Sequence, residues 1–175
     1  GTQTSSLCFG GEGTPHATLA QTESWDGTSW TEVADLNTAR EFGAGCGTNT
    51  AALCFGGGHP PNLPTGSASN ELWNGSSWTE VGDLNNNSAY HSGGGVSTAA
   101  ISMGRYSPSS PLWPNTEAWN GTSWTEVADL SLGRYFTGGG GTQGASLLIS
   151  GQSSPGTQNV VNTEEFSTIF QITPE

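Results

Sequence analysis

The sequence has little charge and no lysine at all. Only 10% of its 175 residues are charged, against roughly 25% in an average soluble domain, and its three basic residues are all arginines. Fifteen acidic residues bring the formal net charge to −12. Such a surface repels phosphate backbones and anionic lipid headgroups, so we expect neither a nucleic-acid partner nor binding to an anionic membrane.

Long apolar segments and helical periodicity are missing as well. No apolar run approaches the roughly 20 residues that a membrane-spanning helix needs, so membrane insertion is not expected. The 27 glycines and nine prolines indicate many turns between short strands. Disordered chains are poor in aromatic residues, whereas this one has seven tryptophans. These features predict a folded, all-β chain.

Residue patterns that carry catalysis or hold metals are also lacking. The three histidines have no metal-ligand spacing, and there is no Ser-His-Asp, paired-carboxylate or phosphate-loop pattern. The odd number of cysteines (Cys8, Cys46 and Cys54) predicts free thiols, which we expect to be buried as small apolar side chains. We therefore expect no enzymatic activity, no metal site and no cofactor.

The chain does contain a repeated segment. Residues 23–36 (ESWDGTSWTEVADL) return almost unchanged at 71–84 and 117–130. This period of 46 to 48 residues indicates a repeat architecture in which each unit buries its apolar face against a copy of itself. The repeats divide a single domain approximately into residues 1–36, 37–84, 85–130 and 131–175.

Two tryptophans flank an Asp-Gly or Asn-Gly turn in each complete segment, which favours a β-hairpin. A two-residue turn would make Trp25 and Trp30 diagonal neighbours, whereas a four-residue turn would place them directly opposite each other. Both turns put the two rings on one face of the sheet. We expect Trp30, Trp78 and Trp124 to be buried between repeats, with a loss of about 3–5 kcal/mol for each replacement by alanine.

A glutamate two residues before the first tryptophan position recurs in every repeat, as Glu23, Glu71, Glu117 and Glu164. Recurrence at one place predicts a structural role, namely accepting hydrogen bonds from the backbone or from an arginine of the same repeat. Calcium binding by such carboxylates is the alternative.

A second strand pair follows each tryptophan hairpin, and its first strand is rich in glycine, as a strand crowded near a central axis would be. Four short antiparallel strands per repeat describe a propeller blade. The Gly56-Gly57 doublet, Glu71 with Trp73, and Trp78 together resemble the kelch repeat. Arg40 and Arg134 also stand where kelch repeats carry an arginine. The resemblance implies a kelch-like β-propeller of four-stranded blades, although Ser88 replaces that arginine in the third repeat and the last repeat diverges after residue 166.

Strand counting predicts an incomplete ring. Gly1 aligns with Gly47, the turn after the first strand of a blade, so the first blade lacks its inner strand. About three and three-quarter blades are therefore expected. We expect an upstream segment of a longer protein, or neighbouring subunits, to complete the propeller, because an unpaired sheet edge is normally covered.

The loops after the second strand of each repeat differ, whereas the hairpin turns hardly change. Variation confined to one class of loop predicts a binding face. Flat aromatic rings suit stacking on sugars, and polar side chains can fix a ligand's orientation. The candidate binding residues are Tyr106 and Trp113 for stacking, with Arg105, His59 and Asn62 for polar contacts.

The uniform repeats are similar to kelch-like repeats of phage and bacterial surface or virion proteins. This resemblance implies a non-enzymatic binding or attachment module, extracellular or on a virion, that recognises a glycan or a protein surface. One alternative is a purely structural subunit held by its neighbours. Another is a fragment of a galactose-oxidase-like enzyme, although no set of tyrosine, histidine and cysteine copper ligands can be assembled from the sequence. Intracellular kelch adaptors form a further class, but their basic groove is not visible here.

Overall fold

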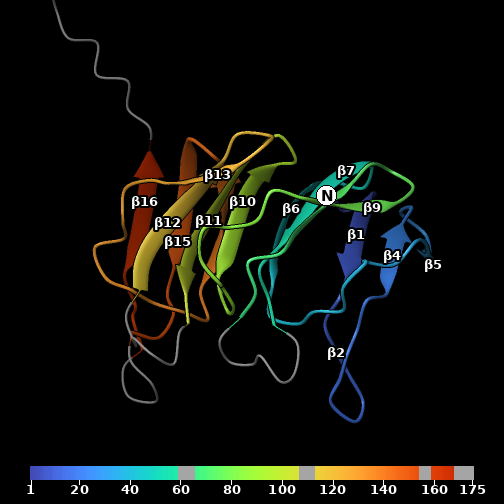
Figure 1. Ribbon diagram of the computed structural model, residues 1–175, viewed down its shortest axis with the longest axis horizontal. Helices are drawn as coiled ribbons and strands as arrows, with labels where there is room; N and C mark the ends of the chain where they lie inside the picture. The colour runs from blue at the N-terminus through green and yellow to red at the C-terminus, as the bar shows by residue number, and fades with distance from the viewer. Residues whose placement is uncertain (59–65, 107–112, 154–158, 168–175) are drawn as a thin grey trace, which may run out of the picture.

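The computed structural model describes residues 1–58, 66–106, 113–153 and 159–167. These residues form strands, turns and loops and contain no helix, which confirms the prediction of an all-β chain (Figure 1).

Within these described ranges, the strands form four antiparallel sheets and one small hairpin. The first sheet has three strands: β1 (Ser6–Phe9), β4 (Thr22–Trp25) and β5 (Trp30–Glu32). The second has four: β6 (Ala44–Thr48), β7 (Ala51–Phe55), β8 (Asn70–Trp73) and β9 (Trp78–Val81). The third sheet also has four strands: β10 (Ser92–Val96), β11 (Ala99–Arg105), β12 (Trp113–Trp119) and β13 (Trp124–Glu126). The fourth contains β14 (Gly138–Thr142), β15 (Ala145–Ile149) and β16 (Thr163–Ser167).

The strand order agrees with the repeats. Within each sheet, neighbouring strands follow one another in sequence order. The first sheet lacks an inner strand, as the alignment of Gly1 with Gly47 predicted. The outer strand expected for the fourth repeat lies outside the described residues. The loop after β1 forms a hairpin of its own, β2 (Glu12–Gly13) with β3 (Ala17–Thr18).

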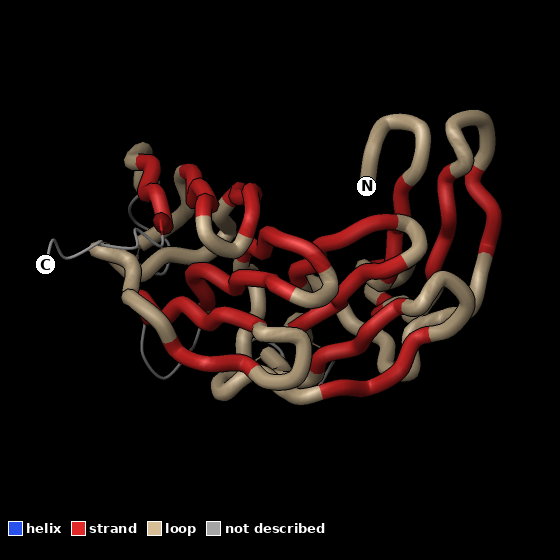
Figure 2. The backbone as a smooth tube through the Cα atoms, turned by 90° about the horizontal axis from the view of Figure 1, so that it is seen from above, coloured by secondary structure: helices blue, strands red, loops and turns tan. Residues whose placement is uncertain are grey.

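The four sheets stand side by side along an arc that is open on one side (Figure 2). The glycine-rich strand β10 packs between β6 and β14. A Cβ atom on Gly93 would come within 2.5 Å of the Phe55 ring, and one on Gly45 within 2.5 Å of the Phe9 ring. Glycine therefore allows the inner strands to approach the preceding sheet closely.

The tryptophan hairpins close through four-residue turns, so the two-residue alternative is wrong. Trp25 lies directly opposite Trp30, and the same register joins the tryptophan pairs of the second and third sheets. The physical reason is the side chain that begins the turn. Asp26 Oδ1 accepts hydrogen bonds from the amides of Thr28 and Ser29 at 2.8 and 2.9 Å, which stabilises the longer loop.

Apolar side chains are buried between neighbouring sheets. Trp78 of the second sheet packs edge-on against Phe9 of the first, with ring centroids 5.0 Å apart. Trp124 of the third packs against Phe55 of the second at 4.9 Å. Both tryptophans are at most 5% exposed, whereas Trp30 is 48% exposed. The prediction for Trp30 is therefore wrong, because no described sheet packs against that face of the first sheet.

Three of the four recurring glutamates, Glu71, Glu117 and Glu164, accept hydrogen bonds from the segments that connect neighbouring sheets. Glu71 is 1% exposed and accepts hydrogen bonds from Arg40 Nη2 at 2.5 Å and from the amides of Asn37 and Thr38. Arg134 pairs in the same way with Glu164. The structural role predicted for these carboxylates is confirmed for both pairs.

The three thiols are predicted to react very differently. All are free, and Cys8 is exposed rather than buried because its face of the first sheet is uncovered. Burial raises the pKa of both Cys46 and Cys54 to about 12, which leaves little reactive thiolate near neutral pH. In dilute native protein we expect a disulfide reagent to modify one thiol quickly and two only slowly, with all three reacting after denaturation. Rapid reaction of two thiols in the native protein would contradict the burial of Cys46 and Cys54.

Candidate recognition surface

Three aromatic residues occupy the same place before the inner strands of the second, third and fourth sheets. Phe42, Tyr90 and Phe136 have φ angles of 59°, 57° and 52°. Bulky side chains rarely adopt this left-handed conformation, which costs roughly 1–3 kcal/mol at each residue. Backbone hydrogen bonds hold it in place, since the Tyr90 amide donates to the Phe42 carbonyl and the Phe136 amide to the Tyr90 carbonyl, both at 2.9 Å.

The rings of these residues are in contact with one another. Phe42 and Tyr90 stack at a centroid distance of 4.3 Å, and Phe136 meets Tyr90 edge-on at 4.7 Å. Tyr106 contacts both Tyr90 and Tyr135, at 5.8 and 5.0 Å. We call Phe42, Tyr90, Tyr106, Tyr135 and Phe136 the aromatic platform.

The aromatic platform combines buried support with an open surface. Tyr135 is only 5% exposed, whereas Phe42 is 39% and Phe136 is 55% exposed. Burial, helped by nearby carboxylates, raises the pKa of Tyr90, so its phenol stays protonated and can donate a hydrogen bond at neutral pH. The surface thus offers apolar ring faces with a neutral polar group among them.

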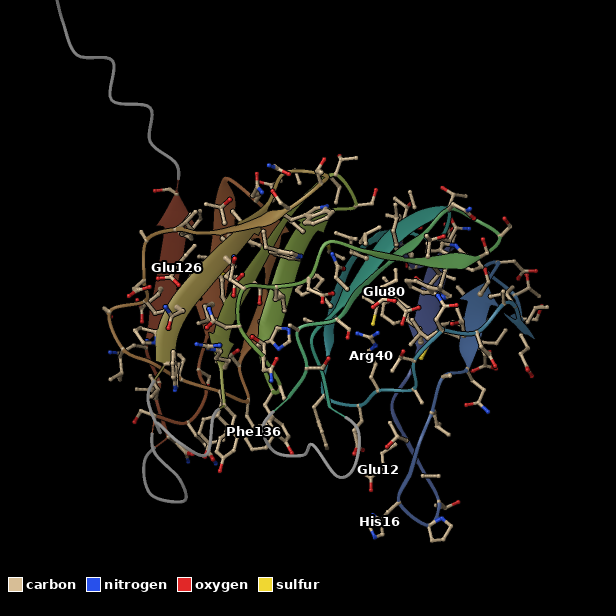
Figure 3. All side chains as sticks on the ribbon, in the orientation of Figure 1. Glu12, His16, Arg40, Glu80, Glu126 and Phe136 are labelled. Carbon is tan, nitrogen blue, oxygen red and sulfur yellow. The ribbon has the colours of Figure 1, made fainter. Side chains whose placement is uncertain are left out.

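The platform lies at the edge of the sheets from which the variable loops leave. Tyr106 directly follows β11, and Tyr135 is bridged to Gln152, which follows β15. Figure 3 shows Phe136 at this edge, from which the β2–β3 hairpin carrying His16 also extends. The predicted location of the binding face and the aromatic platform therefore coincide.

Arg105 is buried beside the platform. Its guanidinium lies 4.0 Å from the centroid of the Trp113 ring, and Nη1 donates to the Asn87 carbonyl at 3.1 Å. Its Nε and Nη2 atoms have no hydrogen-bond partner among the described residues. Burial lowers the pKa of Arg105, and the nearby Glu117 opposes that shift. Arg105 thus supplies the positive charge near Glu117 that Ser88 cannot.

The structure places the five predicted site residues as follows. Tyr106 belongs to the aromatic platform. Arg105 is buried below it, 5% exposed, and Trp113 is half-buried with one ring face against that guanidinium. His59 and Asn62 lie outside the described residues.

Phe42, Tyr90 and Phe136 were not among the site residues predicted from the sequence. The recurrence of an aromatic residue at the same position of three repeats was the sequence signal that could have identified them. Their φ angles depend on hydrogen bonds between residues 46 to 48 positions apart, which the local sequence does not reveal.

His91, next to Tyr90, lies between the second and third sheets against Phe55 and Gly56. Both ring nitrogens are buried, and the Phe55 backbone is the neighbouring polar group that favours their protonation. Complete burial, reinforced by the charge of Arg105, lowers its pKa from 6.5 to about 4. The folded protein therefore holds His91 neutral at physiological pH.

We expect the stability of the protein to depend on pH through His91. Above pH 6.5 His91 is neutral in both the folded and the unfolded chain, so its titration does not lower the free energy of unfolding. Between about pH 6.5 and 4 the unfolded chain binds a proton that the folded chain does not, which lowers the free energy of unfolding by about 3 kcal/mol. Denaturant titrations across this range measure the loss. His91→Thr, which inserts the residue of the fourth repeat, should remove most of the dependence, whereas exposed His16→Gln should keep it.

Other places in the described residues offer less to a ligand. A hollow of about 800 Å³ runs along the inner strands, but its lining is mostly glycine, including Gly45, Gly94 and Gly140, with little to specify a ligand. Within the described ranges, no group of three or more His, Cys, Asp or Glu residues could hold a metal ion. Nor do those ranges contain a helix long and apolar enough to cross a membrane.

Among known proteins, no family model matches the chain and no curated protein is significantly similar to it.

Proposed function

We propose that this chain is a non-enzymatic recognition module whose aromatic platform binds a neutral glycan. The observation that carries the proposal is the ladder of Phe42, Tyr90 and Phe136, three exposed or half-exposed rings held at positive φ. Backbone strain repeated at one place in a fold is typical of a functional surface. Strain that served packing alone would be expected to bury these rings.

We further propose that the four sheets are blades of a kelch-like β-propeller. The packing of β10 between β6 and β14, and the radial succession of the sheets, support this interpretation (Figure 2). In such a disc the aromatic platform surrounds the axis on the face that carries the variable loops. That is a favoured place for a ligand because several loops converge there.

The choice of a neutral glycan follows from ring shape and charge. Aromatic rings present flat apolar faces, which match the C–H faces of a sugar ring, and tyrosine hydroxyls can bond to sugar hydroxyls. The net charge of −12 opposes sialylated, sulfated or phosphorylated ligands. Placement of the chain on a virion or in an extracellular structural protein is part of the same proposal and rests on the resemblance of its repeats.

A glycan array with the purified chain tests the proposal. We expect retention on neutral glycans and none on anionic ones. Phe136→Ala should weaken binding about 10-fold or more, since losing one stacking contact costs about 1–3 kcal/mol. Tyr106→Ala should have a similar effect.

Val96→Ala is the matched control. Val96 is also half-exposed, but it lies at the opposite end of β10 from Tyr90. This variant should bind like the unmodified chain. Binding that survives the loss of both Phe136 and Tyr106 rings, or that occurs only on anionic glycans, would refute the proposed site.

A further inference from the structure

The two ends of the row of sheets expose apolar side chains that are buried in the middle of the row. We call the outer face of the first sheet, with Cys8, Trp25 and Trp30, the tryptophan face. The outer face of the fourth sheet, with Leu147 and Ile149, is the aliphatic face. Trp30, Leu147 and Ile149 are each between 46% and 48% exposed.

Inside the chain, the residues that correspond to these two faces pack against each other. Leu53 and Phe55 of the second sheet align with Leu147 and Ile149, and both are completely buried. Phe55 is covered by Trp124 of the third sheet, which aligns with Trp30. The first two internal interfaces thus pack a tryptophan-bearing face on an aliphatic or aromatic face, whereas at the third Leu148 and Phe166 pack on Ile101 and Met103.

A hydrogen bond across the first interface adds a specific contact. Trp78 Nε1 donates to Thr22 Oγ1 at 3.0 Å, and Thr22 is fully buried. Trp78 aligns with Trp30, and Thr22 aligns with Thr163 at the start of β16, which is exposed. The acceptor that Trp30 would need is therefore present at the other end of the same chain.

We propose that a second copy of this chain docks head to tail, with the tryptophan face of one copy on the aliphatic face of the other. The contact continues an interface that the chain already forms within itself. Because the sheets follow an open arc, the reciprocal contact between the remaining two faces closes a two-copy ring (Figure 2). This inference does not depend on the proposed glycan binding.

Sedimentation velocity over a range of protein concentrations tests the proposal. We expect a species of twice the 18.0 kDa chain mass. Added salt should strengthen the association, because each copy carries a net charge of −12 and salt screens their repulsion. The exposed thiol of Cys8 should be protected from labelling as the dimer forms, since the aligned Cys54 is buried inside the chain.

Two variants identify the faces. Trp30→Asp and Ile149→Asp change exposed side chains and should each raise the dissociation constant at least about 30-fold. A mixture of the two variants should regain a 1:1 complex, because one intact tryptophan face then meets one intact aliphatic face. Val96→Asp, on neither face, should associate normally.

A chain that stays monomeric up to about 100 μM, well above the dissociation constants of stable complexes, would overturn the proposal. So would a dimer that both variants leave unchanged, or a variant mixture that shows no complex. Those results would assign the two faces to a different occupant.

Discussion

Replacing Trp78 by alanine is expected to lower the free energy of unfolding by about 3–5 kcal/mol. The side chain is 5% exposed, packs on the Phe9 ring and donates to Thr22 Oγ1. The substitution therefore leaves a cavity between two sheets and removes the partner of a buried hydroxyl. Equilibrium unfolding in guanidinium chloride, followed by circular dichroism, gives the value.

Trp30→Ala is the matched control, because it removes the same ring from the aligned position of an uncovered sheet. In dilute protein its loss should stay below about 1.5 kcal/mol, since Trp30 contacts chiefly Trp25 and remains half-exposed. Equal losses for the two variants would mean that Trp30 is also covered by protein, or that Trp78 is not.

Replacing Arg40 by methionine should cost a comparable amount, about 3–5 kcal/mol. Arg40 is 4% exposed, and its guanidinium bonds to Glu71 and to the carbonyls of Gly56 and Ser69. Without it, the buried Glu71 carboxylate keeps only its backbone and amide donors and loses its counter-charge. Chemical denaturation near neutral pH measures the effect.

Glu80→Gln removes an exposed carboxylate from the neighbouring strand β9 and should change stability by less than about 0.5 kcal/mol (Figure 3). A loss below about 1 kcal/mol for Arg40→Met would contradict a structural role for the buried pair.

Repetition made much of the fold predictable. The spacing of the tryptophans predicted the sheets, because a repeated unit must pack in the same way each time. The alignment of Gly1 with Gly47 predicted that the first sheet lacks an inner strand. Repetition did not distinguish the two possible turns. That choice depended on Asp26 bonding to two following amides, an interaction that competes locally with the shorter turn.

Equal positions in a repeat did not have equal environments at the ends of the chain. Trp30 and Cys8 were expected to be buried like Trp78 and Cys54, but burial depends on having a neighbouring sheet as well as on the residue. Alignment of the repeats shows which residue occupies each position, but it does not show whether a neighbouring sheet covers that residue.

The candidate site was predicted in part. The differing loops led to the edge where the aromatic platform lies and to Tyr106, because variation on a uniform scaffold is visible in the sequence. The ladder of Phe42, Tyr90 and Phe136 was not predicted, since it arises from backbone hydrogen bonds between repeats. Their positive φ angles became evident only in the structure.

The most direct test of the recognition surface is an NMR titration with the strongest neutral glycan from the array. We predict the largest amide and ring-proton shifts at Phe42, Tyr90, Tyr106 and Phe136, at one edge of the sheets. Shifts confined to the hairpin turns 74–77 and 120–123, at the opposite edge, would contradict the account.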